Sequence, residues 1–208
     1  MNKRIYLVLF VAVMTASYAQ AELTFGVRAG LNLTDVHSTA TAGSVTITHT
    51  TDPKVGFQAG LVADYALSNT FSIQPAVVFA TQGGKVGRNN NSINYRLNYI
   101  QVPINAIYKI DLGFAGLLLQ AGPYFGYALN GNTSVDGSDR STDIEFGSNN
   151  NELKPFDFGV GAGAGLQFGN LQLVLGYNFG FADLTNINST TLRNNGVALT
   201  ATILFGGR

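Results

Sequence analysis

Residues 171–181 read LQLVLGYNFGF, a stretch in which large apolar residues alternate with small or polar ones. One phase carries leucine, tyrosine and phenylalanine, and the other carries glutamine, valine, glycine and asparagine. A period of two residues is typical of a β-strand, because successive side chains point to opposite faces of a sheet. The stretch therefore predicts a strand with one apolar face.

The same alternation recurs along the chain and predicts eight strands. They lie near residues 23–33, 54–66, 70–82, 94–110, 115–129, 154–168, 171–183 and 194–205. The fourth strand changes phase, because Leu97 and Tyr99 precede an apolar series in the opposite phase that begins at Ile100. We expect either a β-bulge at this point or an upper part that stands clear of a membrane.

The segments between these strands alternate in length. The long ones, which are rich in Asn, Ser, Thr and Asp, cover residues 34–53, 83–93, 130–153 and 184–193, and the short ones cover 67–69, 111–114 and 169–170. Gly169-Asn170 is typical of a two-residue hairpin turn. Long external loops and short periplasmic turns are typical of transmembrane barrels. The sequence thus predicts an all-β fold, an eight-stranded antiparallel up-and-down transmembrane β-barrel.

Composition indicates which phase faces outward. A soluble lipocalin-like barrel would also alternate, but its outward phase would be rich in charge, about 25–35% of surface residues. Here the polar phase is mostly Gly, Ala, Gln, Ser and Thr, and charged residues make up 12% of the chain. Aromatic residues also gather near both ends of the predicted strands, as they do at membrane interfaces. We therefore expect the apolar phase to face lipid.

The N-terminus predicts an export signal. Lys3 and Arg4 precede an apolar stretch from Ile5 to Ala16, and Ala19-Gln20-Ala21 is a small-x-small cleavage site. The stretch is too short for an anchoring transmembrane helix. We therefore expect residues 1–21 to be a signal peptide cleaved after Ala21 and residues 22–208 to form a barrel in the cell outer membrane.

Charge and cysteine content exclude several classes of function. The net charge is zero, and removing Lys3 and Arg4 with the leader leaves 10 basic against 12 acidic side chains, about −2. Because no basic cluster remains, nucleic-acid binding is not expected. The sequence has no cysteine, so disulfides, thiolate metal sites and lipid attachment at an N-terminal cysteine are excluded.

Several short motifs resemble the PorT-like outer-membrane β-barrel family. They are Phe25-Gly-Val-Arg-Ala-Gly-Leu-Asn-Leu33, Gly56-Phe-Gln-Ala-Gly60, Phe71-Ser-Ile-Gln-Pro75, Thr81-Gln-Gly83, Leu97-Asn-Tyr-Ile-Gln-Val-Pro103, Ala121-Gly-Pro123 and Phe156-Asp-Phe-Gly159. The resemblance covers the mature chain in order and implies an eight-stranded outer-membrane barrel of a didermic bacterium. The family takes its name from a secretion-system component, but most members have no established activity. Where the family usually has an acidic residue, this chain has Ala76.

Four charged residues fall on the phase predicted to line the lumen: Arg28, Asp64, Lys109 and Asp157. Unpaired charges in a narrow interior are costly, so each needs a partner or water. Eight strands leave an interior just wide enough for side chains. We expect these residues to form a stabilising polar plug rather than a conducting pathway.

Three other groups of residues have a functional interpretation. Gly159-Val-Gly-Ala-Gly-Ala164, with Asp183 downstream, fits a dinucleotide fingerprint, but that motif needs a turn and a helix, whereas a strand is predicted here. A catalytic rim is suggested by His37 and His49, which share a loop with Asp35, Ser38 and Asp52. A calcium site is suggested by Asp136, Asp139, Asp143 and Glu145, without EF-hand spacing.

Taken together, these features predict a non-enzymatic outer-membrane barrel that acts through its surface loops or through envelope integrity. No catalytic, cofactor or metal residue is assigned, and outer-membrane lipid is the expected partner. The alternatives are an outer-membrane component of a protein secretion machine and a barrel-embedded hydrolase or acyltransferase at the rim near His37 and His49. Envelope protein partners are possible, but the sequence does not identify them.

Overall fold

The computed structural model describes residues 22–42, 45–87, 92–137, 141–149, 152–187 and 190–206. The predicted signal peptide lies outside the described residues. Within them the chain forms ten strands. They are β1 (Glu22–Ala42), β2 (Val45–Thr50), β3 (Asp52–Ala66), β4 (Phe71–Val86), β5 (Ile93–Asp111), β6 (Gly116–Val135), β7 (Ser141–Asp143), β8 (Phe156–Phe168), β9 (Leu171–Gly180) and β10 (Thr190–Phe205). In this described part, no helix is long and apolar enough to cross a membrane.

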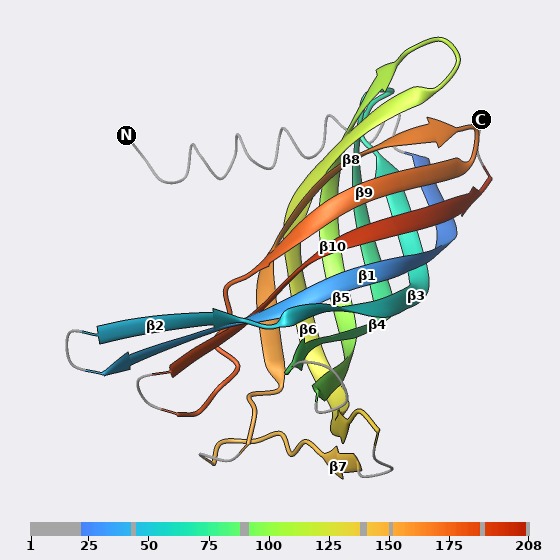
Figure 1. Ribbon diagram of the computed structural model, residues 1–208. Helices are drawn as coiled ribbons and strands as arrows, with labels where there is room; N and C mark the ends of the chain where they lie inside the picture. Colours follow the sequence, from blue (N-terminus) through green and yellow to red (C-terminus); the bar gives the residue numbers. More distant parts are fainter. Residues whose placement is uncertain are drawn as a thin grey trace, which may run out of the picture.

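All the strands belong to one antiparallel sheet, in the order β10-β9-β8-β6-β5-β4-β3-β1-β2, with β7 against β6. β1 also pairs with β10, from Phe25 opposite Phe205 to Ala40 opposite Thr190. The sheet therefore curves round on itself, as Figure 1 shows, and has an interior and an outer surface. Apart from β2 and β7, consecutive strands are neighbours, which is the meander expected from the pattern of short and long connections.

Tight turns occupy one end of the curved sheet. Gly169 has a φ of 56° and Gly113 a φ of 86°, and both lie in turns where the left-handed region favours glycine. At the opposite end β1 runs on past its last pair with β3, Thr34 opposite Lys54, and pairs with β2 instead. This β1–β2 hairpin projects from that end together with the first residues of β10, which pair with β1 as far as Ala40 opposite Thr190 (Figure 1).

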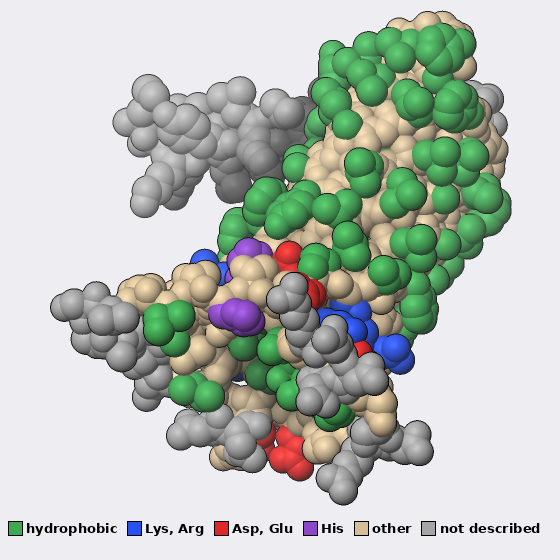
Figure 2. Space-filling model, in the orientation of Figure 1, with side chains coloured by type: hydrophobic (Ala, Val, Ile, Leu, Met, Phe, Trp, Pro, Cys, Tyr) green, Lys and Arg blue, Asp and Glu red, His purple; other side chains and the backbone are tan. Residues whose placement is uncertain are grey.

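The two faces of the sheet carry the two phases of the alternation. Leu175 is 57% exposed on the outer surface, whereas Val174 beside it is 5% exposed in the interior. Hydrophobic side chains are spread over the outer surface, and charged ones gather toward the end from which the hairpin projects (Figure 2). The structure thus agrees with the predicted outward facing of the apolar phase.

The sequence prediction undercounted the strands by two. β2 lies in the segment 34–53 and β7 in the segment 130–153, both of which were predicted as loops. β2 reads VTITHT, and its β-branched residues favour an extended backbone. Alternation did not identify this strand because its described residues are exposed on both faces.

The change of phase in the fourth strand does not come from a reversal of β5 itself. β5 keeps one facing throughout, with Leu97, Tyr99 and Gln101 all buried in the interior. A register shift does occur between Asn98 and Tyr99, but the extra residue lies on β6, because Asn98 pairs with Asn130 and Tyr99 with Ala128. The upper apolar residues of β5 are therefore packed inside.

Candidate functional site in the interior and at the outer rim

Asp64 is the centre of a hydrogen-bond network near the end that carries the tight turns. Its side chain is 5% exposed. Oδ1 accepts hydrogen bonds from Ser72 Oγ at 2.9 Å and from Gln74 Nε2 at 3.1 Å. Oδ2 lies 3.4 Å from Nζ of Lys109, which reaches across from β5. The carboxylate is thus satisfied by two neutral donors and one cation.

Arg28 joins the same network through Gln74. Its guanidinium donates to Gln74 Oε1 at 2.5 Å and, through Nε, to Thr202 Oγ1 at 3.1 Å. Gln74 also donates to Gln172 Oε1 at 3.1 Å. Gln74 thereby connects Arg28 to Asp64, so three of the four charged residues predicted for the lumen share one network.

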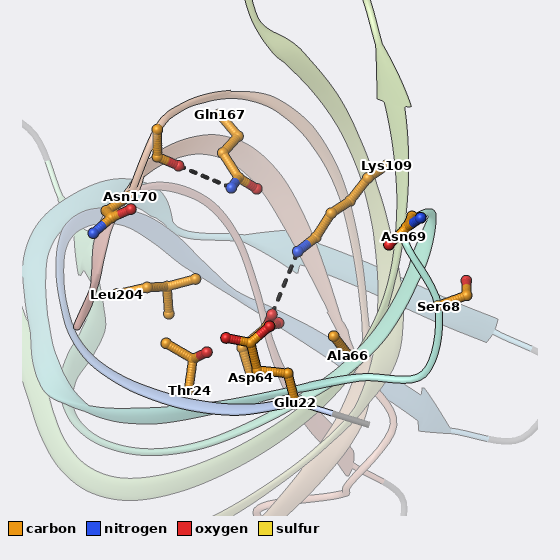
Figure 3. Close-up of a pocket in the computed structure, with 11 residues that line it drawn as sticks. Glu22, Thr24, Asp64, Ala66, Ser68, Asn69, Lys109, Gln167, Asn170 and Leu204 are labelled. Carbon is orange, nitrogen blue, oxygen red and sulfur yellow. Dashed lines mark hydrogen bonds and ion pairs between the residues drawn. The ribbon is translucent and has the colours of Figure 1, made fainter. Parts of the chain in front are cut away.

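Asp64 and Lys109 of this network line an open vestibule of about 230 Å³ at the turn end. Figure 3 looks into it: Lys109 and Asp64 meet across the opening, and Gln167 bonds to the backbone of the 169–170 turn. Further in, two smaller cavities of about 50 Å³ and about 10 Å³ lie among the described interior side chains. The second has room for about one water molecule.

Asp157, the fourth predicted lumen residue, lies apart from this network near the other end. It is 0% exposed, and its Oδ2 accepts a hydrogen bond from Asn194 Nδ2 at 3.3 Å. Asn194 Nδ2 also lies 3.4 Å from the hydroxyl of Tyr99. Within the described residues Oδ1 of Asp157 has no hydrogen-bond partner. The structure therefore divides the four charges between two interior clusters.

An apolar lid covers part of the interior toward the end opposite the vestibule. Leu97, Tyr99 and Ala128 form a buried cluster inside the sheet. Three partly buried residues that follow β6 in the chain pack against it, namely Ile144, Phe146 and Leu153. Residues of the segment 130–153 thus fold back over the mouth, which explains why the upper part of β5 carries apolar residues on its interior face.

The two histidines do not form a shared site. His37 Nε2 lies 3.0 Å from Asp35 Oδ1, and its Nδ1 lies 3.3 Å from Thr50 Oγ1. His49 pairs in register with Ser38, so strand alternation directs it to the opposite face of the hairpin from His37. Ser38 is on that opposite face too. The backbone of the hairpin therefore separates Ser38 from the His37–Asp35 pair. A nucleophile and its base must lie within hydrogen-bonding reach of each other, and these side chains do not.

The other two suggested sites lack the geometry that they need. The segment from Gly159 to Ala164 lies wholly within β8, where a Cβ on Gly159 would approach the Tyr124 ring to 2.7 Å. These glycines make room for interior side chains. Asp136 pairs with Lys85 at 2.6 Å. No three acidic or histidine residues of the described ranges form a metal-binding group, and Asp139 lies outside those ranges.

The residues that sequence reasoning missed are uncharged amides. Gln74, Gln172 and Asn194 connect the charged groups of both clusters, and all three are buried. Each one falls on the interior phase of its strand, so the alternation itself could have identified them. From the sequence, a glutamine on that phase is predicted only to be an uncharged residue that lines the interior, because the sequence does not indicate its hydrogen-bond partners.

Comparison with known proteins identifies a family for this chain and several similar solved structures. A match to the outer membrane protein beta-barrel domain family covers residues 18–186. No curated protein is detectably similar to this chain in sequence. Neisserial surface protein A is a similar solved structure, with 17% identity over 88% of this chain and 99% of its own and a TM-score of 0.45. Ail, the attachment invasion locus protein of Yersinia pestis, has 16% identity over 88% and 99%, with a TM-score of 0.40. Because the family match covers most of the chain, the protein belongs to the outer membrane protein beta-barrel domain family.

Proposed function

We propose that the protein is a closed eight-stranded barrel that spans the outer membrane, is not an enzyme, and acts through the β1–β2 hairpin outside the cell. Closure is supported by the two partners of β1, which pairs with β3 and with β10. Eight strands, all except β2 and β7, then each have two neighbours in the ring. This arrangement leaves no edge within the membrane, where unpaired backbone groups are costly.

The apolar outer surface supports membrane insertion with lipid as the partner. Leucine, valine and phenylalanine side chains are exposed along most strands, including Leu31, Leu61, Leu119 and Leu199. Exposed apolar area of this extent marks an interaction surface or a membrane-facing surface. We also propose that the chain is a PorT-like barrel, on the basis of its ordered motifs.

The projecting hairpin is the observation that carries the proposed mode of action. The interior holds a polar plug and an apolar lid, which argues against transport. The serine and the histidine–aspartate pair lie on opposite faces of the hairpin, which argues against catalysis at the rim. The hairpin, in contrast, continues β1 beyond its last pair with β3, Thr34 opposite Lys54, and its β2 residues from Thr46 to Thr50 are exposed. We infer that it presents a surface to an external partner.

A shortened hairpin tests this function. Ser38 and His49 lie directly opposite each other, so an Asn-Gly turn can replace residues 39–48 and keep the pairs below them. The replacement also removes two pairs with β10, Thr39 with Thr191 and Ala40 with Thr190. A deletion strain is complemented with the wild type or with this variant, and adhesion, envelope permeability and secretion are measured together. We expect the variant to reach the outer membrane folded but to fail to restore the lost property. Full restoration by the shortened barrel would contradict the proposal.

A further inference from the structure

We propose that the outer surface beside the hairpin carries a binding site for the phosphate of an anionic glycolipid in the outer leaflet. The inference rests on the proposed insertion of the barrel into the outer membrane. The site is an open groove of about 430 Å³ on the outer surface, between the base of the hairpin and the end of β9. Its lining includes Phe179, Phe181, His37 and Arg193, together with three threonines.

The groove lies where the outer surface changes from apolar to polar. On the pair β1–β10, Leu33 lies opposite Val197, and both are exposed. Going outward on the same face, the next row pairs Asp35 with Asn195, and the row after that pairs His37 with Arg193. Four residues of tilted strand raise this last row by about 10 Å above Leu33. The long side chain of Arg193 can therefore reach lipid headgroups directly outside the hydrocarbon core.

Two aromatic side chains form the apolar part of the groove. Phe179 pairs in register with Asn195. Phe179 and Phe181 are both about half exposed, and both point outward beside Arg193. Aromatic rings at this depth are suited to contact the upper acyl chain and the sugar of a lipid. The groove thus offers two aromatic rings below and beside a cation, groups that suit the acyl chain and the phosphate of one lipid.

The charges at the groove favour an anion. Among the described residues, no carboxylate lines it. Asp35, on the neighbouring row, is paired with His37. The guanidinium of Arg193 is exposed and makes no hydrogen bond or ion pair with the residues that the structure describes. A free guanidinium binds phosphate through two parallel hydrogen bonds. The exposed Arg193 is therefore available to hold a lipid phosphate.

The test measures lipid binding by the full mature barrel. Wild-type protein in detergent is mixed with diphosphorylated lipid A or with the same lipid after phosphate removal, and the one-lipid complex is quantified by native mass spectrometry. The variant Arg193→Gln removes the cation. The matched control Arg96→Gln removes an arginine that is also exposed, at the outer end of β5 and away from the groove.

We expect Arg193→Gln to weaken binding of the phosphorylated lipid about tenfold, the loss of one charge-assisted contact. Arg96→Gln should bind as the wild type does, and removing the phosphates should lower wild-type binding to the level of Arg193→Gln. Equal binding by Arg193→Gln and wild type would overturn the proposal, as would equal losses in the two variants, which would indicate nonspecific attraction.

A second pair of variants tests the apolar part independently. Phe181→Ala removes one of the two aromatic rings that line the groove, and Phe168→Ala removes an exposed ring at the opposite end of the barrel. We expect only Phe181→Ala to weaken binding, and equal binding by the two would overturn the proposed site.

Insertion into lipid vesicles is scored separately for each protein by resistance to added protease. Failure of the wild type to insert would refute the proposed function, whereas normal insertion with no effect at Arg193 and Phe181 would refute the lipid site alone.

Discussion

The Nζ atom of Lys109 lies 3.4 Å from Oδ2 of Asp64 in the vestibule, where the two side chains approach from β5 and β3. The two side chains differ in their burial and in the other hydrogen bonds that they make. Asp64 accepts two further hydrogen bonds, from Ser72 and Gln74, and is almost wholly buried. Lys109 is more exposed and can exchange its partner for water.

This asymmetry predicts different effects of the two truncations. Asp64→Ala leaves buried donors of Ser72 and Gln74 unsatisfied, and we expect it to lower the free energy of unfolding by about 2–3 kcal/mol. Lys109→Met removes a partly solvated ion pair and should cost about 1 kcal/mol or less. Urea unfolding in lipid vesicles measures both values. A loss at Lys109→Met equal to that at Asp64→Ala would contradict the proposed centre of the network.

The lowered pKa of Asp136, a residue outside the proposed membrane-spanning region, predicts that its contact with Lys85 depends on pH. A hydrogen bond from Lys85 and a weaker contribution from Asn94 hold the pKa of Asp136 below its ordinary value of 3.8. Because the folded pKa is lowered, the contact stabilises the folded loop above the ordinary pKa. This stabilisation is lost as the pH falls from about 3.8 through the lowered pKa.

Carbon NMR of the Asp136 carboxyl group checks this prediction. We expect a titration midpoint below 3.8 in the wild type. Lys85→Met should raise the midpoint more than Asn94→Ala does, since the Lys85 hydrogen bond is the larger cause. A midpoint that does not move in Lys85→Met would show that the 2.6 Å contact between Lys85 and Asp136 is absent in solution.

Export is tested at the N-terminus. The Ala19-Gln20-Ala21 site predicts that the mature protein begins at Glu22 and fractionates with the outer membrane. N-terminal sequencing of protein extracted from that fraction measures this directly. Retention of Met1 in the membrane-bound protein would contradict cleavage after Ala21.

Topology is tested with two epitope insertions. An epitope placed between Ala42 and Val45, at the tip of the hairpin, should be labelled on intact cells, and protease added to such cells should cut within residues 130–153 where surface polysaccharide leaves them open. The matched insertion between Gly169 and Asn170 should be labelled only after the outer membrane is opened. Labelling of the 169–170 turn on intact cells would reverse the orientation.

The main strands and their facing could be predicted from the sequence because alternation directly reflects a two-sided environment. Leu173 and Val174 are both apolar, yet the surrounding pattern assigned one outward and the other inward, and the structure agrees. The hairpin extension could not be predicted in the same way, since β2 is solvated on both faces and therefore does not alternate.

The interior contacts could not be predicted from the sequence for a different reason. Leu97 and Tyr99 are apolar on the interior phase because Ile144, Phe146 and Leu153 fold over them, and that contact joins segments far apart in the chain. The connection of Arg28 to Asp64 through Gln74 likewise depends on three strands meeting across the interior. Charged residues could be assigned to the lumen, but their division into two clusters required coordinates.

The central claim, that the apolar outer surface lies in a membrane, is tested most directly by two arginine substitutions on β9. Leu175 and Leu171 are the same residue type on the same face of the same strand, but Leu171 begins the strand at the turn end. An arginine costs about 2–4 kcal/mol at mid-membrane and about 0–1 kcal/mol near an interface. The free energy of unfolding in lipid vesicles should therefore fall by at least about 1.5 kcal/mol more for Leu175→Arg than for Leu171→Arg. Equal losses would contradict membrane insertion, because the outer surface would then experience the same solvent at both depths.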